Sequence, residues 1–580
     1  MPASILRSLF KVKTPNPTRR SRRSAPRARA LLAACALWAA LQPHTRAATG
    51  AAVRLNTVGY LPPHEKRATL PAPCGDFQVV RVSDGKTVLR GTSAGPAREN
   101  DTGEDLCVAD FTALREAGLY RLEAGAARSA PFRVGRDVYE EAFKTAVRAM
   151  HLWRCGAAVR LEHKGVTYAH AACHLADARL DFVGGPAGAR RDAAGGWHDA
   201  GDYNKYVVNA GVTVGVLLRA WEEFGARVRR VKLELPPTRG ALPAYLAEVQ
   251  WELDWLLKMQ AADGAVHHKV STRDFGPAVA PEEEQTERFI TPWSSAATAD
   301  FVAMTATAAR AFEPFDARYS RRLLDAARKS YAFLRAHPES RRADLKGFTT
   351  GGYQTDDADD RLWAAAELWQ TTGDPDPRAD FEERARRFES KFSQDWGWGD
   401  VKNLGMLTYL FSARAGRDAR LVRQVREALL ETADQIVLIR DRSRHARPLT
   451  RYYWGANGGV AGTTVLLRAA HRLDPKPVYI ETALDALSNL FGRNFYGRSF
   501  VTGLGADPPR APHDRRSMAK GSAGAWPGYL VGGGWPRATD WADDSDNYRV
   551  NEIAINWNAP LVYALAAALP ETRPEGWEKR

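Results

Sequence analysis

The feature that most constrains the fold of this chain is a single change of sequence texture near residue 137. Before it, from about Val53 to Val134, short apolar runs alternate with polar residues and are broken by Gly, Asp and Pro. After it, apolar residues recur at helical spacing in one segment after another. Period-two alternation is typical of half-buried strands, and a 3.6-residue period is typical of helices. We therefore expect a small β-domain over residues 50–136 and a large helical domain over residues 137–574.

The first region has the texture of a β-sandwich of roughly eighty residues, with runs such as FQVVRVSD and GLYRLEAG as its strands. It contains Cys74 and Cys107. In an exported protein these two cysteines could form a disulfide, but two buried free thiols fit the sequence nearly as well. The sequence leaves both possibilities open.

The second region predicts a mainly α fold. Its candidate helices lie near residues 137–154, 207–224, 243–261, 295–312, 318–336, 358–371, 379–392, 399–413, 418–437, 458–472, 477–491 and 552–569. Paired as six hairpins, these helices would close an (α/α)6 barrel whose loops gather at one mouth, where catalytic groups usually lie. The absence of a short sequence repeat makes a solenoid less attractive.

Residues 1–47 explain most of the chain's net charge of +14, because they hold ten Lys or Arg residues and no Asp or Glu. They also hold the apolar run ALLAACALWAAL. A basic stretch with a short apolar run and small residues at its end is typical of an export signal, and this run is too short to span a bilayer comfortably. We therefore expect an exported protein, periplasmic or secreted, with no nucleic-acid partner and no membrane contact after export.

The first segment that points to chemistry is GGWHDAGDYNKYVVN, residues 195–209. Its carboxylates Asp199 and Asp202 lie three residues apart in a Gly-rich turn, so both can face one water molecule. Like charges held close together resist joint ionisation, which separates their pKa values and can create a base. Spacing alone is equally compatible with a helix cap or a calcium loop.

The second segment, residues 541–566, contains Asp543, Tyr548 and Glu552. We expect Glu552 to open the helix at 552–569 among apolar neighbours, and an apolar environment raises the pKa of a carboxyl group as a general acid requires. On position alone, however, a first-turn glutamate favoured by the helix dipole is the commoner explanation. A third segment, residues 497–517, places His513 and Arg515 after a Pro-rich loop, where charged donors suit sugar hydroxyls but give only a weak signal.

Together these segments resemble glycoside hydrolase family 9, the inverting cellulases. The matching residues are Trp541, Asp543, Tyr548, Glu552, Ala554, Asn558 and Ala559, then Ser499–Thr502, Gly505, Pro512, His513 and Arg515, and the Asp-Ala-Gly-Asp loop. One position departs from the family pattern, since Asp507 stands where Asn, Lys or Arg is usual. The stretch VRLNTVGYLPPHEKRA resembles the opening of the immunoglobulin-like domain that precedes the barrel in one branch of the family.

The resemblance implies a role for each candidate residue. Asp202 would be the general base that activates water, Asp199 would help to hold that water, and Glu552 would be the general acid. Asp543 and His513 would support the acid and the bound sugar, and the expected sugar contacts are Arg515, Tyr548 and Trp454. An inverting enzyme needs room for a water, so we expect roughly 6.5–9.5 Å between the carboxyl groups of the base and the acid.

A possible metal site precedes the base. Cys155, Cys173, His174 and His198 form a ligand set that suits tetrahedral zinc. From the residues alone, a Cys155–Cys173 disulfide is about as plausible, and His163 or His170 could be the true ligand. The resemblance favours a structural zinc site made by the first four residues. Family members often bind calcium as well, but the acidic run 282–284 can equally be a solvated loop, so calcium ligands stay unassigned.

The leading functional interpretation is therefore an inverting endoglucanase acting on β-1,4-linked glucan. Two different functions stay open at this point. One is an exo-acting glucosidase or glucosaminidase on short oligosaccharides, because a small domain packed on the barrel could block one end of the groove. The other is a non-catalytic sugar-binding protein, which the retention of both Asp202 and Glu552 argues against. We expect a monomer.

Overall fold

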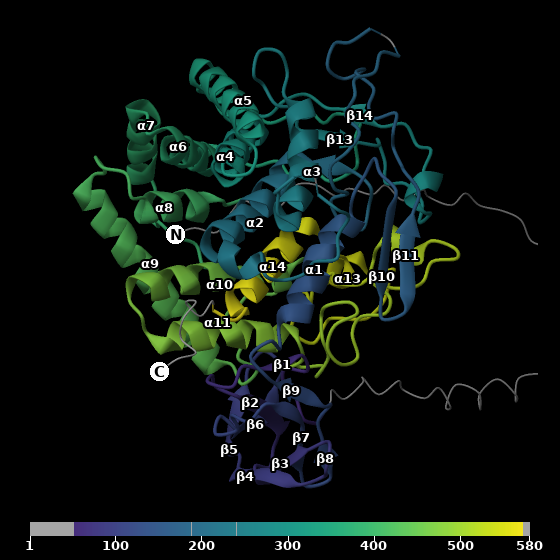
Figure 1. The fold of residues 1–580 in the computed structure, drawn as a ribbon, viewed down its shortest axis with the longest axis vertical. Coiled ribbons are helices and arrows are strands. Elements are labelled where there is room, and N and C mark those ends of the chain that lie inside the picture. The colour runs from purple at the N-terminus through teal and green to yellow at the C-terminus, as the bar shows by residue number, and fades with distance from the viewer. Residues whose placement is uncertain (1–51, 187, 239, 572–580) are drawn as a thin grey trace, which may run out of the picture. The chain divides into compact units, whose positions relative to one another are not determined.

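The computed structural model describes residues 52–186, 188–238 and 240–571. The predicted export signal, residues 1–47, lies outside the described residues. Strands occupy the chain as far as Val134, and the first helix begins at Glu140 (Figure 1). The prediction of a β-sandwich followed by an (α/α)6 barrel is therefore confirmed.

The β-sandwich consists of two sheets. One has the order β2 (Arg67–Pro71), β6 (Glu104–Asp110) and β5 (Ala94–Glu99). The other has the order β1 (Gly59–Tyr60), β9 (Phe132–Val134), β7 (Gly118–Ala124), β3 (Asp76–Arg81) and β4 (Thr87–Thr92), with β8 (Ala127–Arg128) paired to β7. Alternate side chains of these strands, among them Phe77, Tyr120 and Phe132, form a separate apolar core.

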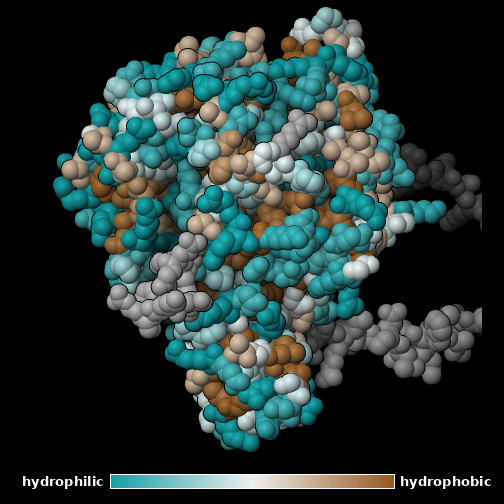
Figure 2. Space-filling view, viewed as in Figure 1, coloured by the Kyte–Doolittle hydropathy of each residue, from teal (hydrophilic) through white to brown (hydrophobic). Residues whose placement is uncertain are grey.

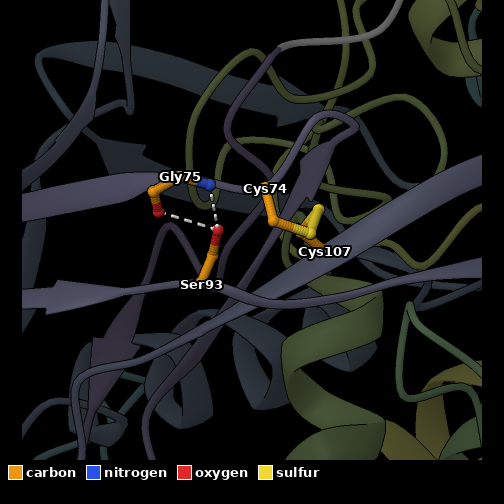
Figure 3. Close-up of a disulfide and its surroundings, with 4 residues drawn as sticks. All are labelled: Cys74, Gly75, Ser93 and Cys107. Carbon is orange, nitrogen blue, oxygen red and sulfur yellow. Dashed lines mark hydrogen bonds between the residues drawn. A yellow bond between two sulfur atoms is a disulfide. The ribbon is translucent and has the colours of Figure 1, made fainter.

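Cys74 and Cys107 form a disulfide in this sandwich (Figure 3). Cys107 belongs to the central strand β6, and Cys74 lies just before β3 in the facing sheet. The neighbouring residue Gly75 exchanges hydrogen bonds of 3.0 Å with the Ser93 hydroxyl through both its amide and its carbonyl. The crosslink therefore decides between the two possibilities that the sequence left open.

Twelve helices of the larger region correspond to the twelve predicted ones. The inner helices are α2 (Val207–Val228), α4 (Ser295–Phe312), α6 (Ala358–Thr372), α8 (Lys402–Phe411), α10 (Ala456–Leu473) and α14 (Ile555–Ala568). The outer helices are α1 (Glu140–Leu152), α3 (Ala244–Met259), α5 (Ala317–Ala336), α7 (Pro375–Arg387), α9 (Ala419–Arg442) and α11 (Pro477–Leu490). In the inner set α14 packs on α10 and α2, α2 on α4, α4 on α6, and α6 on α8.

Inner helix α4 and outer helix α5 differ in composition as their positions require. Inner helix α4 is buried along almost its whole length and is built largely from Ala, Thr, Phe and Val. A helix surrounded by other helices needs small or apolar residues on every side. Outer helix α5 buries only one stripe, and its Arg and Lys residues lie elsewhere. The burial of these two helices therefore matches their positions in the barrel.

The helical region also contains short elements that the sequence pattern did not predict. A hairpin joins β10 (Val159–His163) to β11 (Val166–His170), and β12 (Lys205–Tyr206), β13 (Lys269–Ser271) and β14 (Phe289–Ile290) form a small sheet. Two four-residue helices, α12 (Arg515–Met518) and α13 (Tyr548–Asn551), and the 3-10 turn η1 (Pro281–Glu283) lie in loops. The pieces of two to four residues are too short for periodicity to reveal, and the β10–β11 hairpin lies in a segment between two predicted helices.

One prediction about the last helix was wrong. Glu552 does not open it, because α14 begins at Ile555 and Glu552 itself has extended backbone angles. The extension has a physical cause: Glu552 bridges to His513, and Ile553 bridges to Val531. Since Glu552 lies outside the first turn, the helix dipole does not account for it.

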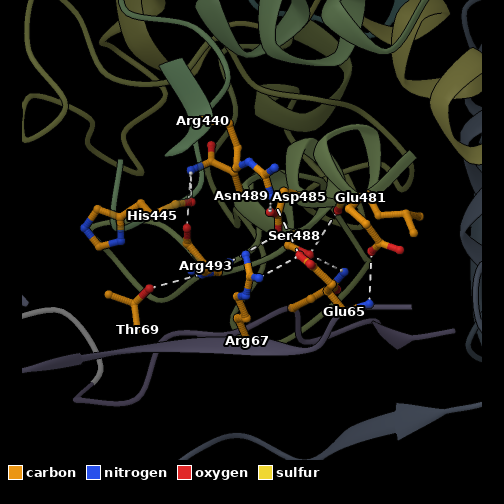
Figure 4. Close-up of polar contacts among 12 residues, drawn as sticks. Glu65, Arg67, Thr69, Arg440, His445, Glu481, Asp485, Ser488, Asn489 and Arg493 are labelled. Carbon is orange, nitrogen blue, oxygen red and sulfur yellow. Dashed lines mark hydrogen bonds and ion pairs between the residues drawn. The ribbon is translucent and has the colours of Figure 1, made fainter. Parts of the chain in front are cut away.

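Polar contacts join the sandwich to the barrel (Figure 4). The Thr69 hydroxyl of β2 donates to the Arg444 carbonyl at 2.5 Å and accepts from Arg493 at 3.1 Å. Asp485 accepts from both Arg493 and Arg440. On the face shown in Figure 2, apolar residues form scattered patches among polar ones. Among the described residues, no helix combines the length and apolar character needed to cross a bilayer.

Candidate active site

The loop that carries the two aspartates is forced into a tight course by its glycines. Gly195 and Gly196 have φ angles of +101° and +76°, which L-residues with side chains rarely adopt. A Cβ atom on Gly196 would also lie 2.8 Å from the ring of Trp255. The chain therefore passes close over α3 and delivers Asp199 and Asp202 to the mouth of the barrel.

Both carboxylates are buried and held by neutral donors. Asp199, 2% exposed, accepts hydrogen bonds of 2.7 Å from the Tyr353 hydroxyl and from Asn209 Nδ2. Asp202, 5% exposed, accepts a bond of 2.6 Å from Asn204 Nδ2. The two side chains therefore have fixed positions before any substrate is bound.

Backbone contacts bring Glu552 to the same place from the other end of the chain. The Ile555 amide donates to the Asp199 carbonyl at 2.9 Å, and the Gly201 backbone lies close enough to the Glu552 carboxyl group to lower its pKa. Gly201 lies so close to His513 that a Cβ atom there would be 2.2 Å from the His513 carbonyl oxygen. Only glycine fits between the base loop and the segment of His513, so Gly201 determines how closely these two segments approach.

Electrostatics separates the acids. Burial, followed by the charge of Asp202, raises the pKa of Asp199 to about 8. Burial also raises the pKa of Asp202, but the nearby Arg515 guanidinium and the Asn204 hydrogen bond oppose that rise. The pKa of Glu552 is raised well above its ordinary value by burial and then by the charges of Asp202 and Asp199. Asp202 is thus favoured to be ionised while Glu552 keeps its proton.

The other predicted site residues surround this cluster. Arg515 donates to the Gly201 carbonyl from its side chain at 3.1 Å and from its amide at 3.0 Å. His513 Nδ1 lies 2.7 Å from the Ser545 carbonyl. Asp543 faces the loop before His513, where it accepts from the Arg510 and Ala511 amides and pairs with Arg498. Its carboxylate is therefore engaged in positioning the histidine loop.

A cavity of about 440 Å³ lies near Asp199: its wall includes Asn556, which is 3.4 Å from Asn209, the residue that bonds to Asp199. Its aromatic lining consists of Trp396, Trp398, Tyr453, Trp454 and Trp557. Trp454, 45% exposed, packs edge-on against Tyr548, and Tyr548 in turn lies 5.9 Å from the ring of His513. Flat aromatic faces beside polar groups are suited to bind sugar rings. A larger cavity of about 1170 Å³ lies elsewhere and contains none of the predicted site residues.

Sequence reasoning missed two residues that bond to Asp199, Tyr353 and Asn209, and a third, Asn556, that contacts Asn209. Tyr353 follows two glycines in a loop before α6, Asn209 belongs to the first turn of α2, and Asn556 lies 3.4 Å from Asn209. Only the Gly-Gly-Tyr sequence gave a signal, because such a loop can place a ring close to the barrel axis. The two asparagines lie in apolar helices and carry no local pattern.

The predicted metal ligands do come together. Ligand atoms of Cys155, Cys173, His174 and His198 all lie within 4.8 Å of one another. Cys155 Sγ is 3.7 Å from His174 Nδ1, and Cys173 Sγ is 3.7 Å from His198 Nε2. Tetrahedral zinc holds sulfur and nitrogen ligands roughly 3.5 Å apart, so the four side chains fit that ion. Both thiols are free and buried, which excludes a Cys155–Cys173 disulfide in this structure.

The remaining candidate ligands lie outside this cluster. His163 and His170 belong to the β10–β11 hairpin and are not part of the four-ligand set. The acidic run does not converge on one point: Glu282 accepts from the Ala171 amide, Glu283 from the Ala280 amide, and Glu284 contacts His174. Among the described residues, the Cys/His set is the one group that meets the requirements of a metal site.

An (α/α)6 barrel with paired acids and an aromatic cavity at its mouth is the architecture of a glycoside hydrolase. Comparison with known proteins agrees. The family model for glycosyl hydrolase family 9 matches residues 139–565, and the model for the cellulase N-terminal ig-like domain matches residues 48–129. The chain therefore belongs to glycosyl hydrolase family 9 and is an enzyme of the glycoside hydrolase class.

Individual relatives are similar over most of their length. Endoglucanase D of Acetivibrio thermocellus is 50% identical over 528 residues, which cover 90% of this chain and 84% of the relative. A crystal structure of a metagenome-derived family 9 endoglucanase superposes with a TM-score of 0.84 at 34% identity, covering 90% of this chain and 99% of that one. A crystal structure of a Zn-binding triple mutant of the family 9 endoglucanase J30 has a TM-score of 0.82 at 34% identity and covers 88% of this chain and 100% of that one.

Proposed function

We propose that this chain is an inverting endo-β-1,4-glucanase that hydrolyses internal bonds of cellulose or related β-glucans. The observation that carries the proposal is the convergence of Asp202 and Glu552, which are 350 positions apart, in one cluster with different electrostatic surroundings. The similarity to proteins named endoglucanase supports the choice of reaction and substrate class.

In the proposed reaction Asp202 is ionised and accepts a proton from a water molecule as that water attacks the anomeric carbon. Asp199 holds the same water. Hydrogen bonds from Tyr353 and Asn209 fix the position of the Asp199 carboxylate for this role. Glu552 donates its proton to the departing glycosidic oxygen. His513, Arg515, Tyr548 and Trp454 line the path of the sugar, and Asp543 keeps the histidine loop in place.

We further propose that Cys155, Cys173, His174 and His198 hold a structural zinc ion. Four protein ligands leave no open coordination position, so the ion would supply rigidity and take no part in the reaction. His198 immediately precedes Asp199, so the cluster would anchor the base loop. A calcium site remains without assigned ligands.

We propose export to the periplasm or the medium as the site of action, followed by activity as a monomer. The basic, apolar character of residues 1–47 supports export. The Cys74–Cys107 disulfide supports an oxidising compartment, since such crosslinks are rare in the cytosol.

Product analysis on cello-oligosaccharides tests the reaction directly. NMR during the first turnovers should show the α-anomer formed from the β-linked substrate, and longer chains should be cut at internal bonds. Formation of the β-anomer would overturn the mechanism. Release of single end units from every chain length, with little activity on carboxymethyl cellulose, would replace endo action by exo action.

A further inference from the structure

The third member of the acidic run has a different environment from its neighbours. Glu284 is 7% exposed, and its Oε2 atom lies 3.0 Å from His174 Nε2. The other ring nitrogen, His174 Nδ1, points to Cys155 Sγ. By contrast, Glu283 is exposed and only accepts from a backbone amide at the edge of η1. If the acidic run were only a solvated loop, Glu284 would be exposed. Its burial against the ring of a predicted metal ligand therefore needs another explanation.

A chain of buried ion pairs continues from Glu284 toward the base loop. Arg288 lies 3.6 Å from Glu284 and 3.0 Å from Asp177, and Asp177 lies 3.0 Å from Lys205. The Lys205 ammonium group then donates to the Gly195 carbonyl at 2.9 Å. This series of ion pairs therefore runs without interruption from His174, a predicted metal ligand, to the glycine turn that begins the base loop.

The charges along this chain balance. It contains two carboxylates and two cations, all buried. Isolated buried charges are costly, and removal of one partner leaves its neighbour uncompensated. Arg288 is the most vulnerable to this cost, because within the described part of the chain its guanidinium nitrogens make ion pairs but no hydrogen bond of good geometry. Four buried charges that depend on one another have few other stable arrangements, so these ion pairs can hold the base loop in one position.

We propose that Glu284 is a positioning residue that fixes His174 as an Nδ1 metal ligand and, through Arg288, Asp177 and Lys205, couples the metal cluster to the loop bearing Asp202. This inference rests on the zinc site proposed above. The physical basis is tautomer selection: the carboxylate accepts a hydrogen bond from Nε2–H, which keeps the proton on Nε2 and leaves the Nδ1 lone pair free for the ion. Glu284 does not touch substrate, so its effect on the reaction is indirect.

The experiment compares Glu284→Gln with the matched control Glu283→Gln. Zinc affinity is measured by competition with a chromophoric chelator on the full-length mature protein. Glu284→Gln should bind zinc about 10- to 100-fold more weakly than the wild type, whereas Glu283→Gln should match it. The Co²⁺-substituted Glu284→Gln protein should also show altered visible absorption, because that spectrum reports the geometry of the ligands.

Kinetics separates positioning from substrate binding. In Glu284→Gln with subsaturating zinc, kcat should fall while KM stays near the wild-type value, because the loop carries the base and not the sugar contacts. Saturating zinc should restore part of kcat. Glu284→Asp keeps the charge but shortens the side chain, so its zinc affinity should lie between those of the wild type and Glu284→Gln.

The outcomes distinguish this inference from the metal proposal. If the wild type holds no zinc, the proposed metal itself fails. If the wild type binds zinc and Glu284→Gln binds it equally well, Glu284 is an ordinary buried ion pair and the inference is overturned. Should Glu284→Gln not fold, Glu284→Asp decides the question, since unchanged zinc affinity in that variant would also contradict the inference.

Discussion

The two sides of the cleft are supported by different kinds of interaction. The base side, residues 195–206, rests on thiols, imidazoles and the charged chain that ends at Lys205. The groups next to the acid are neutral: the Gly532 amide donates to the Glu552 carbonyl, and Asn551 bonds to Trp541 and Ala511. The one ion pair described above on this side, Asp543 with Arg498, holds the loop before His513. Among the described residues, Glu552 has no ion-pair partner.

The difference follows from what each acid must do. A base must stay ionised in a buried site, so cations such as Arg515 and Arg288 nearby lower the pKa of Asp202 against the opposing effect of burial. A general acid must keep its proton, so neutral surroundings and neighbouring carboxylates suit Glu552. The comparison therefore predicts that damage to the two sides will have different consequences.

The largest effects should come from the two acids themselves. Asp202→Asn and Glu552→Gln should each lower kcat on cellulose by about 10²- to 10⁴-fold, because each removes one proton transfer. The variants should differ on an aryl cellobioside whose leaving group needs no protonation. On that substrate Glu552→Gln should recover much of its rate, whereas Asp202→Asn should not. Equal behaviour of the two variants would contradict the assigned roles.

Removal of the metal should damage only one side. After dialysis against a strong chelator, amides of residues 193–206 should exchange with deuterium about ten-fold faster or more, since the cluster no longer holds the loop. Amides of residues 550–558 should keep their protection. Hydrogen exchange followed by mass spectrometry gives both values in one experiment. Uniform loss of protection on both sides would show that the metal stabilises the barrel as a whole.

The neutral side should lose stability without a change in pH dependence. Asn551→Ala leaves the buried Trp541 Nε1–H without its acceptor at 3.0 Å, which should lower the free energy of unfolding by about 1–3 kcal/mol. The pH profile of kcat/KM should not move, since no charge is lost. Asn547→Ala is the control, because the Asn547 side chain provides no cap hydrogen bond to α13. Denaturant melts and a pH series provide the two measurements.

The sequence predicted the helices and most of the site residues better than the tertiary contacts between them. Helix periodicity predicted the twelve barrel helices. Spacing alone left Asp199, Asp202, Glu552 and the four metal ligands open, and the resemblance to family 9 singled them out. The placement of Glu552 on a helix failed, because its extended backbone comes from bridges to His513 and Val531 that no local pattern encodes. The role of Glu284 was equally hidden: one residue of three identical ones is buried beside a histidine, and only the tertiary fold determines which.

The smallest expected effect concerns pH and tests the cationic character of the base side. The positive charge of Arg515 lowers the pKa of Asp202 and also that of Glu552. Activity rises with pH as Asp202 ionises and falls as Glu552 loses its proton, so Arg515→Gln should move both limbs of the kcat/KM profile to higher pH. Arg510→Gln is the control, since Arg510 is exposed and pairs with Asp507. A profile that keeps its acidic limb in Arg515→Gln would show that the base side does not depend on this cation, and the contrast between the two sides would then rest on the metal cluster alone.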